Sequence, residues 1–163
     1  MDLLSISLIF SALFCTLVTG FILSYAIIVM PGLSKLNDRE FIRAFQVTDG
    51  IIQNNQPLFI LIWIGSILSI VSTVISSILI VGFFKSWFLI LVAAFYLLGV
   101  QGITISIHLP LNNHIQNLNI DKLSDEILRE ERLKFEDRWN WYNKVRTGIS
   151  FSVSLILIVI VTM

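Results

Sequence analysis

The sequence predicts an all-α integral membrane protein, a four-helix bundle with amphipathic helices in its two long loops. Hydrophobic residues make up 56% of the 163 residues and charged residues only 13%, whereas a soluble domain carries about 25% charged residues. Four uncharged apolar runs account for this difference, and each has at least about the 17 residues that a helix needs to cross a bilayer. None alternates apolar with polar residues as the strands of a membrane β-barrel do.

We expect one membrane domain over residues 1–163, with four spans joined by two long loops and one short turn. The spans are expected at 3–30, 58–84, 86–108 and 144–163, and the long loops at 31–57 and 109–143. The first run is expected to remain as a helix, because it lacks a basic start and exceeds the apolar core of a cleaved signal. Cys15 is the only cysteine, so neither a disulfide within the chain nor a thiolate metal site is expected.

The basic residues indicate how the chain sits in the membrane. Of the 11 Lys and Arg residues, three lie between the first two runs and seven between the last two, and only Lys85 lies on the other side. The positive-inside rule therefore predicts a multi-pass cell-membrane protein with both long loops in the cytoplasm and both termini outside. Acidic residues alternate with the basic ones, so no nucleic-acid partner is expected.

The first long loop contains a candidate pocket wall. Pro31-Gly32 is expected to end the first span as a turn. A capping-box pattern, Asn37-x-x-Glu40, then begins an amphipathic helix. A polar row of this helix borders its apolar row and consists of Gln46, Asp49 and Gln53. This arrangement indicates a half-buried wall, and it also fits a solvated amphipathic helix on the membrane surface.

A second polar row closes the third span. It consists of Gln101, Thr104 and His108. An amide or imidazole within lipid needs a partner, so these side chains should face the bundle. The following Pro110 is expected to stop the helix and expose Asn112. A metal site is not favoured, because His108 and His114 are six residues apart and a helical pair of ligands would be four apart.

The densest polar-aromatic segment, 138–148, precedes the last apolar run. A helix beginning at Asp121 or Ser124 is expected to continue through it, with one face formed by Trp139, Tyr142, Asn143 and Arg146. Spans one and three end on the side where spans two and four begin, so the three polar rows should meet in a pocket at the cytoplasmic mouth. The alternative is that these groups satisfy only helix ends and each other. Tyr25, at the same level, is interpreted as an interfacial anchor.

Several short segments stand in a particular order and spacing along the chain. They are Ser24-Tyr25, Val29-Met30-Pro31-Gly32-Leu33, Glu40-Phe41-Ile42-Arg43-Ala44-Phe45-Gln46, Pro110-Leu111-Asn112, Arg138-Trp139, Asn143 and Val145-Arg146-Thr147. In these segments the chain resembles the anthrone oxygenase-like family of small membrane proteins. The resemblance implies four helices. Most bacterial members are grouped as a domain of unknown function, and fungal relatives oxidise an anthrone to an anthraquinone with O₂ and no recognised cofactor. The chain departs from the family pattern at Asp49 and His108, where members often have Asn.

Two kinds of function fit these residues. In a cofactor-free oxygenase acting on a planar hydrophobic ketone, the catalytic residues would be His108, Asn143 and Arg146. The substrate-binding residues would be Gln46, Asp49, Gln53, Gln101, Asn112, Trp139 and Tyr142. Alternatively, the protein binds a lipophile or quinone, or supports a membrane partner, and Arg146 locks the bundle. A transporter is less favoured, because the outer half of the bundle carries no charge.

Overall fold

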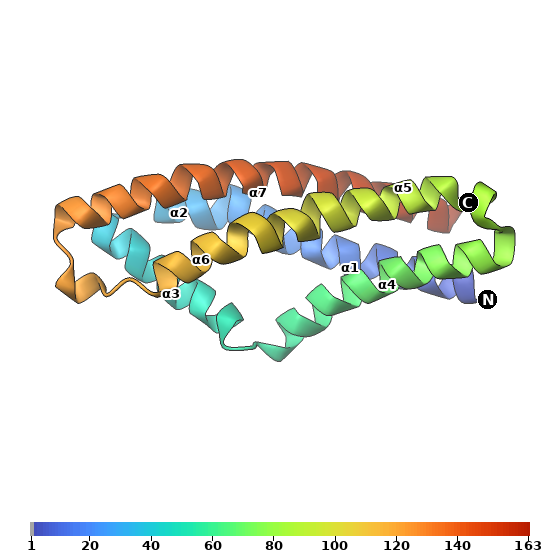
Figure 1. Cartoon of the computed structure of the whole chain (residues 1–163), viewed down its shortest axis with the longest axis horizontal. Coiled ribbons are helices and arrows are strands. Elements are labelled where there is room, and N and C mark those ends of the chain that lie inside the picture. The colour runs from blue at the N-terminus through green and yellow to red at the C-terminus, as the bar shows by residue number, and fades with distance from the viewer. Residues whose placement is uncertain (1) are drawn as a thin grey trace.

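The structure, a computed structural model, describes residues 2–163 and contains only helices and their connections within that range. Four apolar helical segments are long enough to cross a membrane, which confirms the all-α membrane fold (Figure 1). They are Leu3–Leu33, Pro57–Val81, Phe83–Gln116 and Asp125–Thr162. The α-helices are α1 (Leu3–Ser24), α2 (Met30–Leu33), α3 (Asp38–Gln53), α4 (Pro57–Val81), α5 (Trp87–Tyr96), α6 (Leu109–Gln116) and α7 (Asp125–Thr162). Three π-helical turns cover Tyr25–Val29, Leu97–Gly102 and Thr104–His108, and two 3₁₀ turns cover Phe83–Ser86 and Ile120–Lys122.

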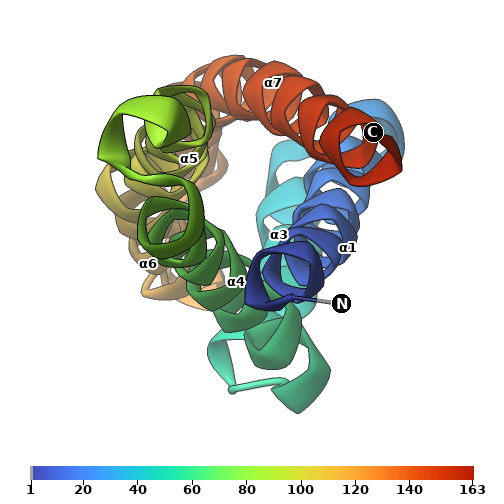
Figure 2. The ribbon, with the colours of Figure 1, turned by 90° about the vertical axis from the view of Figure 1, so that its right-hand side faces the viewer.

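The bundle has two chemically different ends. The chain's two ends and the turn between α4 and α5 lie at one end, and both long loops lie at the other (Figure 1). Seen along the bundle, α1 lies between α4 and α7, and α5 completes the ring (Figure 2). The charged residues of both long loops are therefore gathered at one end of the molecule, which is called the loop end below.

Local sequence signals place the helix ends. The side chains of Asp2, Asn37 and Ser124 cap α1, α3 and α7, each by accepting a hydrogen bond from a backbone N–H three residues later. The last of these caps begins a 38-residue helix that runs without a break from the loop into the fourth span. Gly82, with a φ of 91°, allows the reversal between α4 and α5.

Neither proline that was predicted to end a span does so. The first segment continues through Pro31 to Leu33, and the third continues through Pro110 to Gln116. A proline ring clashes with the carbonyl four residues before it, and in both cases that carbonyl belongs to a π-helical turn. The wider turn accommodates the ring, so each proline follows a local widening of the helix instead of a helix end.

The half of the bundle farther from the loop end, called the outer half below, is closed by packing and by hydroxyl pairs. Small hydroxyl residues meet between the helices, as where the hydroxyl of Thr19 lies 2.6 Å from that of Ser150 and 2.9 Å from that of Ser154. Ser11 and Thr73 join α1 to α4 in the same way, at 2.9 Å. Close packing and hydrogen bonds, more than the hydrophobic effect, hold helices together in lipid.

The loop end is closed by α3 packing on α7. The ring of Phe45 lies edge-on against that of Phe135, with 4.6 Å between centroids. Arg132 of α7 donates to the backbone carbonyl of Leu36 and forms an ion pair with Asp38. This packing makes α3 part of the bundle and not an independent helix on the membrane surface.

We expect Thr19→Val to lower the free energy of unfolding by about 1 kcal/mol, because it leaves two buried serine hydroxyls without their shared partner. The melting temperature in detergent measures this effect. Ser152→Ala is the matched control, because the exposed Ser152 hydroxyl bonds only within its own helix. Equal melting temperatures for the two variants would contradict the assigned role of these hydroxyl pairs.

Candidate functional site

A cavity of about 320 Å³ lies at the loop end, between α1, α3, α4, the third segment and α7. Its volume is at the lower end of the range for small-molecule sites. The residues that line it are Phe21, Tyr25, Phe45, Asp49, Ile52, Gln53, Phe59, Trp63, Ile64, Ile67, Gln101, Thr104, Ile105, His108, Leu109, Asn112, Trp139 and Arg146. This cavity is called the inner cavity below.

A chain of hydrogen bonds crosses one side of the inner cavity. The indole N–H of Trp139 donates to Asn112 Oδ1 at 2.9 Å, and Asn112 Nδ2 donates to Asp49 Oδ1 at 2.8 Å. The other carboxylate oxygen of Asp49 accepts from Gln53 and Gln116. These hydrogen bonds link α7, α6 and α3. Asp49 is only 3% exposed, and three side-chain amides donate to its carboxylate.

Arg146 adds a guanidinium group to the lining of the inner cavity. Its Nε donates to Asn143 Oδ1 at 3.0 Å, and Nη1 donates to the hydroxyl of Thr104 at 2.9 Å. Its charge also lies over the ring of Trp139, with 5.7 Å from Cζ to the centroid. Asn143 itself donates to the backbone carbonyl of Ile22. The guanidinium group is thus held by α7, by the third segment and by the tryptophan ring.

His108 is the exception in this paired environment. It is 2% exposed and packs edge-on against Trp139, with 4.9 Å between centroids. Both ring nitrogens are buried, and neither makes a hydrogen bond of normal geometry among residues 2–163, although the backbone of Tyr142 lies close to the ring. Buried polar atoms are nearly always paired, so an imidazole without partners beside a cavity needs an explanation. A ligand in the inner cavity that bonds to the imidazole would provide this explanation.

Gln101, which lines the inner cavity, belongs to a second and smaller polar cluster. Gln101 Nε2 lies 3.3 Å from the hydroxyl of Tyr96 and 3.4 Å from that of Ser66, and Tyr96 donates to Ser66 at 2.8 Å. The wall formed by α1 and the start of α4 is apolar, with Phe21, Phe59 and Trp63. One side of the cavity is therefore polar and charged, and the other is aromatic.

The structure brings seven of the ten predicted site residues together around the inner cavity. They are Asp49, Gln53, Gln101, His108, Asn112, Trp139 and Arg146. Asn143 lies behind Arg146 and holds it, and Gln46 donates to the backbone carbonyls of Ile115 and Leu118, away from the cavity. Tyr142 is half-buried on α7 and does not line the cavity.

Sequence reasoning missed part of the lining. Tyr25, interpreted as an interfacial anchor, is buried against Trp139 and lines the inner cavity. The aromatic residues Phe21, Phe59 and Trp63 are also in the lining, although nothing in two long apolar runs distinguishes them. The signal that could have found Tyr25 is its position at the loop end of the first span, level with the three polar rows.

Comparison with known proteins bears on the same residues. The family model described as anthrone oxygenase matches residues 57–156, more than half of the chain. The chain belongs to the anthrone oxygenase family. No curated protein and no solved structure matched it.

The region matched to the anthrone oxygenase family contains the chemically most distinctive cavity residues. His108, Asn112, Trp139 and Arg146 all lie inside it, as do Gln101 and the first turns of α4. Asp49 and Tyr25 lie before it. Among the residues that the structure describes, no group of three or more His, Cys, Asp or Glu side chains is placed to hold a metal ion.

We expect the buried carboxylate of Asp49 to make stability depend on pH. Burial raises the pKa of Asp49 above its ordinary value, although the amides of Gln53, Gln116 and Asn112 act in the opposite direction. A raised pKa in the folded state means that folding favours the protonated form of Asp49. The contribution of Asp49 to stability is therefore complete at low pH, and it is lost as the pH rises through the folded-state pKa. The melting temperature of the wild type should therefore fall relative to that of Asp49→Asn as the pH rises from about 4, the ordinary pKa of Asp, towards neutrality.

Asp137→Asn, at an exposed position of α7, controls for the loss of one negative charge. A difference between wild type and Asp49→Asn that is constant over this range, or that shifts in favour of the wild type as pH rises, would contradict the expectation.

Proposed function

We propose that the protein oxidises a planar aromatic ketone of the anthrone type with O₂, and that the inner cavity binds this substrate. The observation that carries the proposal is His108, an imidazole without hydrogen-bond partners beside a cavity whose fixed polar groups include a guanidinium. Membership of the anthrone oxygenase family supports the choice of reaction. The aromatic wall suits a flat ring, because aromatic faces stack on one another.

We also propose that the protein lies in the cell membrane with its loop end in the cytoplasm and both termini outside. Ten of the 11 basic residues lie in or next to the two long loops, and only Lys85 lies near the other end. Translocation of the chain disfavours such a concentration of positive charge on the outer side. The inner cavity would then open at the cytoplasmic level of the bilayer.

The proposed reaction converts a ring CH₂ group and O₂ into a ketone and one molecule of water. His108 takes a proton from the CH₂ carbon, and the electron pair left behind is delocalised onto the existing carbonyl oxygen as an enolate. The enolate carbon transfers electrons to O₂ and forms a C–O bond, and the proton returns to give a hydroperoxide. Loss of water from that carbon then forms the second carbonyl group.

The other cavity residues would stabilise the charge and position the ring. Arg146 is the natural partner of the enolate oxygen, because two contacts hold the guanidinium in place before the substrate arrives. Asn143 would act as a positioning residue through its bond to Arg146 Nε. Trp139 and Phe45 would lie against the flat face of the substrate, while Gln53, Gln101, Asn112 and Asp49 supply polar contacts at the edges.

A second candidate function is binding of a lipophile or quinone without reaction, or support of a membrane partner. The observation that favours it is that Arg146 and Trp139 already tie α7 to the third segment through Thr104 and Asn112. On this view the two side chains are a structural lock, and their loss would unfold the protein before it affected any activity.

We expect His108→Phe to abolish oxidation while leaving the melting temperature equal or higher. The substitution keeps an aromatic ring against Trp139 and removes two polar atoms that no group satisfies, so the native state loses no hydrogen bond. The loss of a general base should lower kcat by roughly 10²-fold or more. Purified protein, O₂ and anthrone are combined, and the appearance of anthraquinone absorbance above a protein-free blank is followed.

The matched control is His114→Phe, which changes the other histidine, an exposed residue paired with Glu131 outside the cavity. It should retain the wild-type rate. A wild type that binds anthraquinone but gives no rate above the blank would favour the binding function. Equal rates for wild type and His108→Phe would remove His108 from the mechanism.

A further inference from the structure

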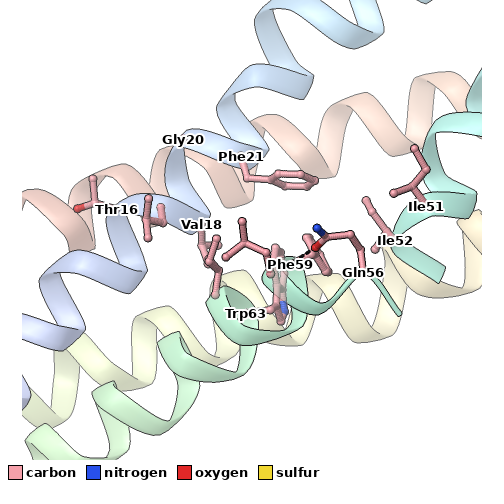
Figure 3. A pocket seen from close by; sticks show the side chains of 12 residues that line it. Thr16, Val18, Gly20, Phe21, Ile51, Ile52, Gln56, Phe59 and Trp63 are labelled. Atoms are coloured by element: carbon pink, nitrogen blue, oxygen red, sulfur yellow. Dashed lines mark hydrogen bonds between the residues drawn. The ribbon is translucent and has the colours of Figure 1, made fainter. Parts of the chain in front are cut away.

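The aromatic wall of the inner cavity is shared with a second cavity of about 570 Å³, called the outer groove below. Figure 3 shows Phe21 of α1 reaching towards Phe59 of α4, with Trp63 beyond it and Ile51 and Ile52 of α3 at the other edge. The residues that line both cavities are Phe21, Ile52, Phe59 and Trp63. The side chains of these shared residues therefore form a partition between the two cavities.

The outer groove is open on the side where the bilayer would lie. Its apolar residues Leu17, Ile51 and Leu58 are all exposed on the protein surface. Its polar lining is limited to Thr16 and Gln56, and Gln56 is already bonded to the backbone N–H of Phe59. A water-soluble ligand would find almost no polar contact there, whereas a flat apolar one would leave lipid at little cost.

The partition is held by ring contacts. The centroid of Phe59 lies 5.1 Å from that of Phe21 and 5.1 Å from that of Trp63, with which it is stacked at 25°. Within residues 2–163, Trp63 takes part in a hydrogen bond beyond the helix backbone only through its carbonyl, which accepts from Ser66, and all three aromatic side chains are half-buried. Rotation of these rings would break stacking contacts and no hydrogen bond.

We infer that the planar lipophilic ligand enters the inner cavity from the bilayer, through the outer groove, and that Phe21, Phe59 and Trp63 form the gate. The inference rests on the proposed function for the class of ligand. The shared partition makes the groove continuous with the site, and its volume and flat ring faces match a planar aromatic molecule. The competing route is the apolar edge of the inner cavity at Ile64 and Ile105, which line the cavity and are exposed on the protein surface.

Gly20 provides a way to fill the outer groove without disturbing the fold. It lines the groove, and a Cβ added there would meet nothing within 4 Å. Gly20→Leu should therefore obstruct the groove while leaving the inner cavity and the helix intact, and Gly20→Ala should obstruct it less. Gly148→Leu is the matched control, because Gly148 is also exposed on a helix, has the same free space and lies outside the groove.

The probe is anthraquinone, added to protein in phosphatidylcholine vesicles, and its association is followed in a stopped-flow instrument by quenching of tryptophan fluorescence. We expect Gly20→Leu to slow association and dissociation equally, by at least about tenfold, because an obstructed route changes both rates and leaves the bound state as it was. Gly20→Ala should give an intermediate rate, and Gly148→Leu the wild-type rate. Melting temperatures confirm that each variant is folded.

Association of Gly20→Leu at the wild-type rate would overturn the inference. Slowing of association by Gly148→Leu to the same degree as by Gly20→Leu would also overturn it. If Ile105→Trp slowed association and Gly20→Leu did not, entry would be assigned to the competing edge. A wild type that binds no anthraquinone would overturn both this inference and the proposed function. A groove-dependent association rate together with no turnover of anthrone would overturn the proposed function and support the entry route.

Discussion

The structure depends on one constraint, that a polar group buried among membrane helices must find its partner inside the protein. Two tethers on α7 satisfy it at the loop end. Trp139 donates to Asn112, which donates in turn to Asp49, and Arg146 donates to Thr104. These bonds bring α3, the third segment and α7 to the same place, although they are far apart in the chain. The inner cavity is the space that these tethers surround.

The two halves of the bundle meet this constraint differently. In the outer half the polar groups are small hydroxyls, which pair across the helices while the backbones stay close, as Thr19 does with Ser150. At the loop end the buried polar side chains are larger, and Asp49 and Arg146 among them are ionisable. Their hydrogen bonds hold the helices around the inner cavity and do not close it. Among the buried side-chain nitrogens and oxygens of residues 2–163, only those of His108 are left without a hydrogen bond. A bundle that needed only stability would gain by replacing that imidazole with an apolar ring.

Composition and periodicity were enough to predict four apolar helices of membrane-spanning length, the capped loop helices and most of the polar residues that line the inner cavity. Asp49 could be predicted because an amphipathic helix with a polar row beside its apolar row has few other ways to bury the apolar row, and Gln53, although exposed, continues the polar row and donates to Asp49. Tyr142 was misleading for a local reason. It shares the face of Trp139 by spacing, but the buried stripe of α7 runs through Asn143 and Arg146 and leaves Tyr142 at its edge. Aromatic residues within uniformly apolar runs, such as Phe59, carry no pattern that separates a cavity wall from a surface that faces lipid.

The π-helical turns explain why the two prolines do not end their helices, and several cavity residues, among them Tyr25, Gln101 and His108, lie in these turns. The hydroxyl of Thr104 donates to the carbonyl of Val100, four residues earlier, at 2.7 Å, as threonine hydroxyls often do within helices. With its proton used in that bond, the same hydroxyl presents lone pairs to Arg146 Nη1. The position of the guanidinium therefore depends on where the third segment places Thr104. Helical periodicity puts Thr104 on the face of Gln101 and His108, but it does not show that Arg146 is its partner.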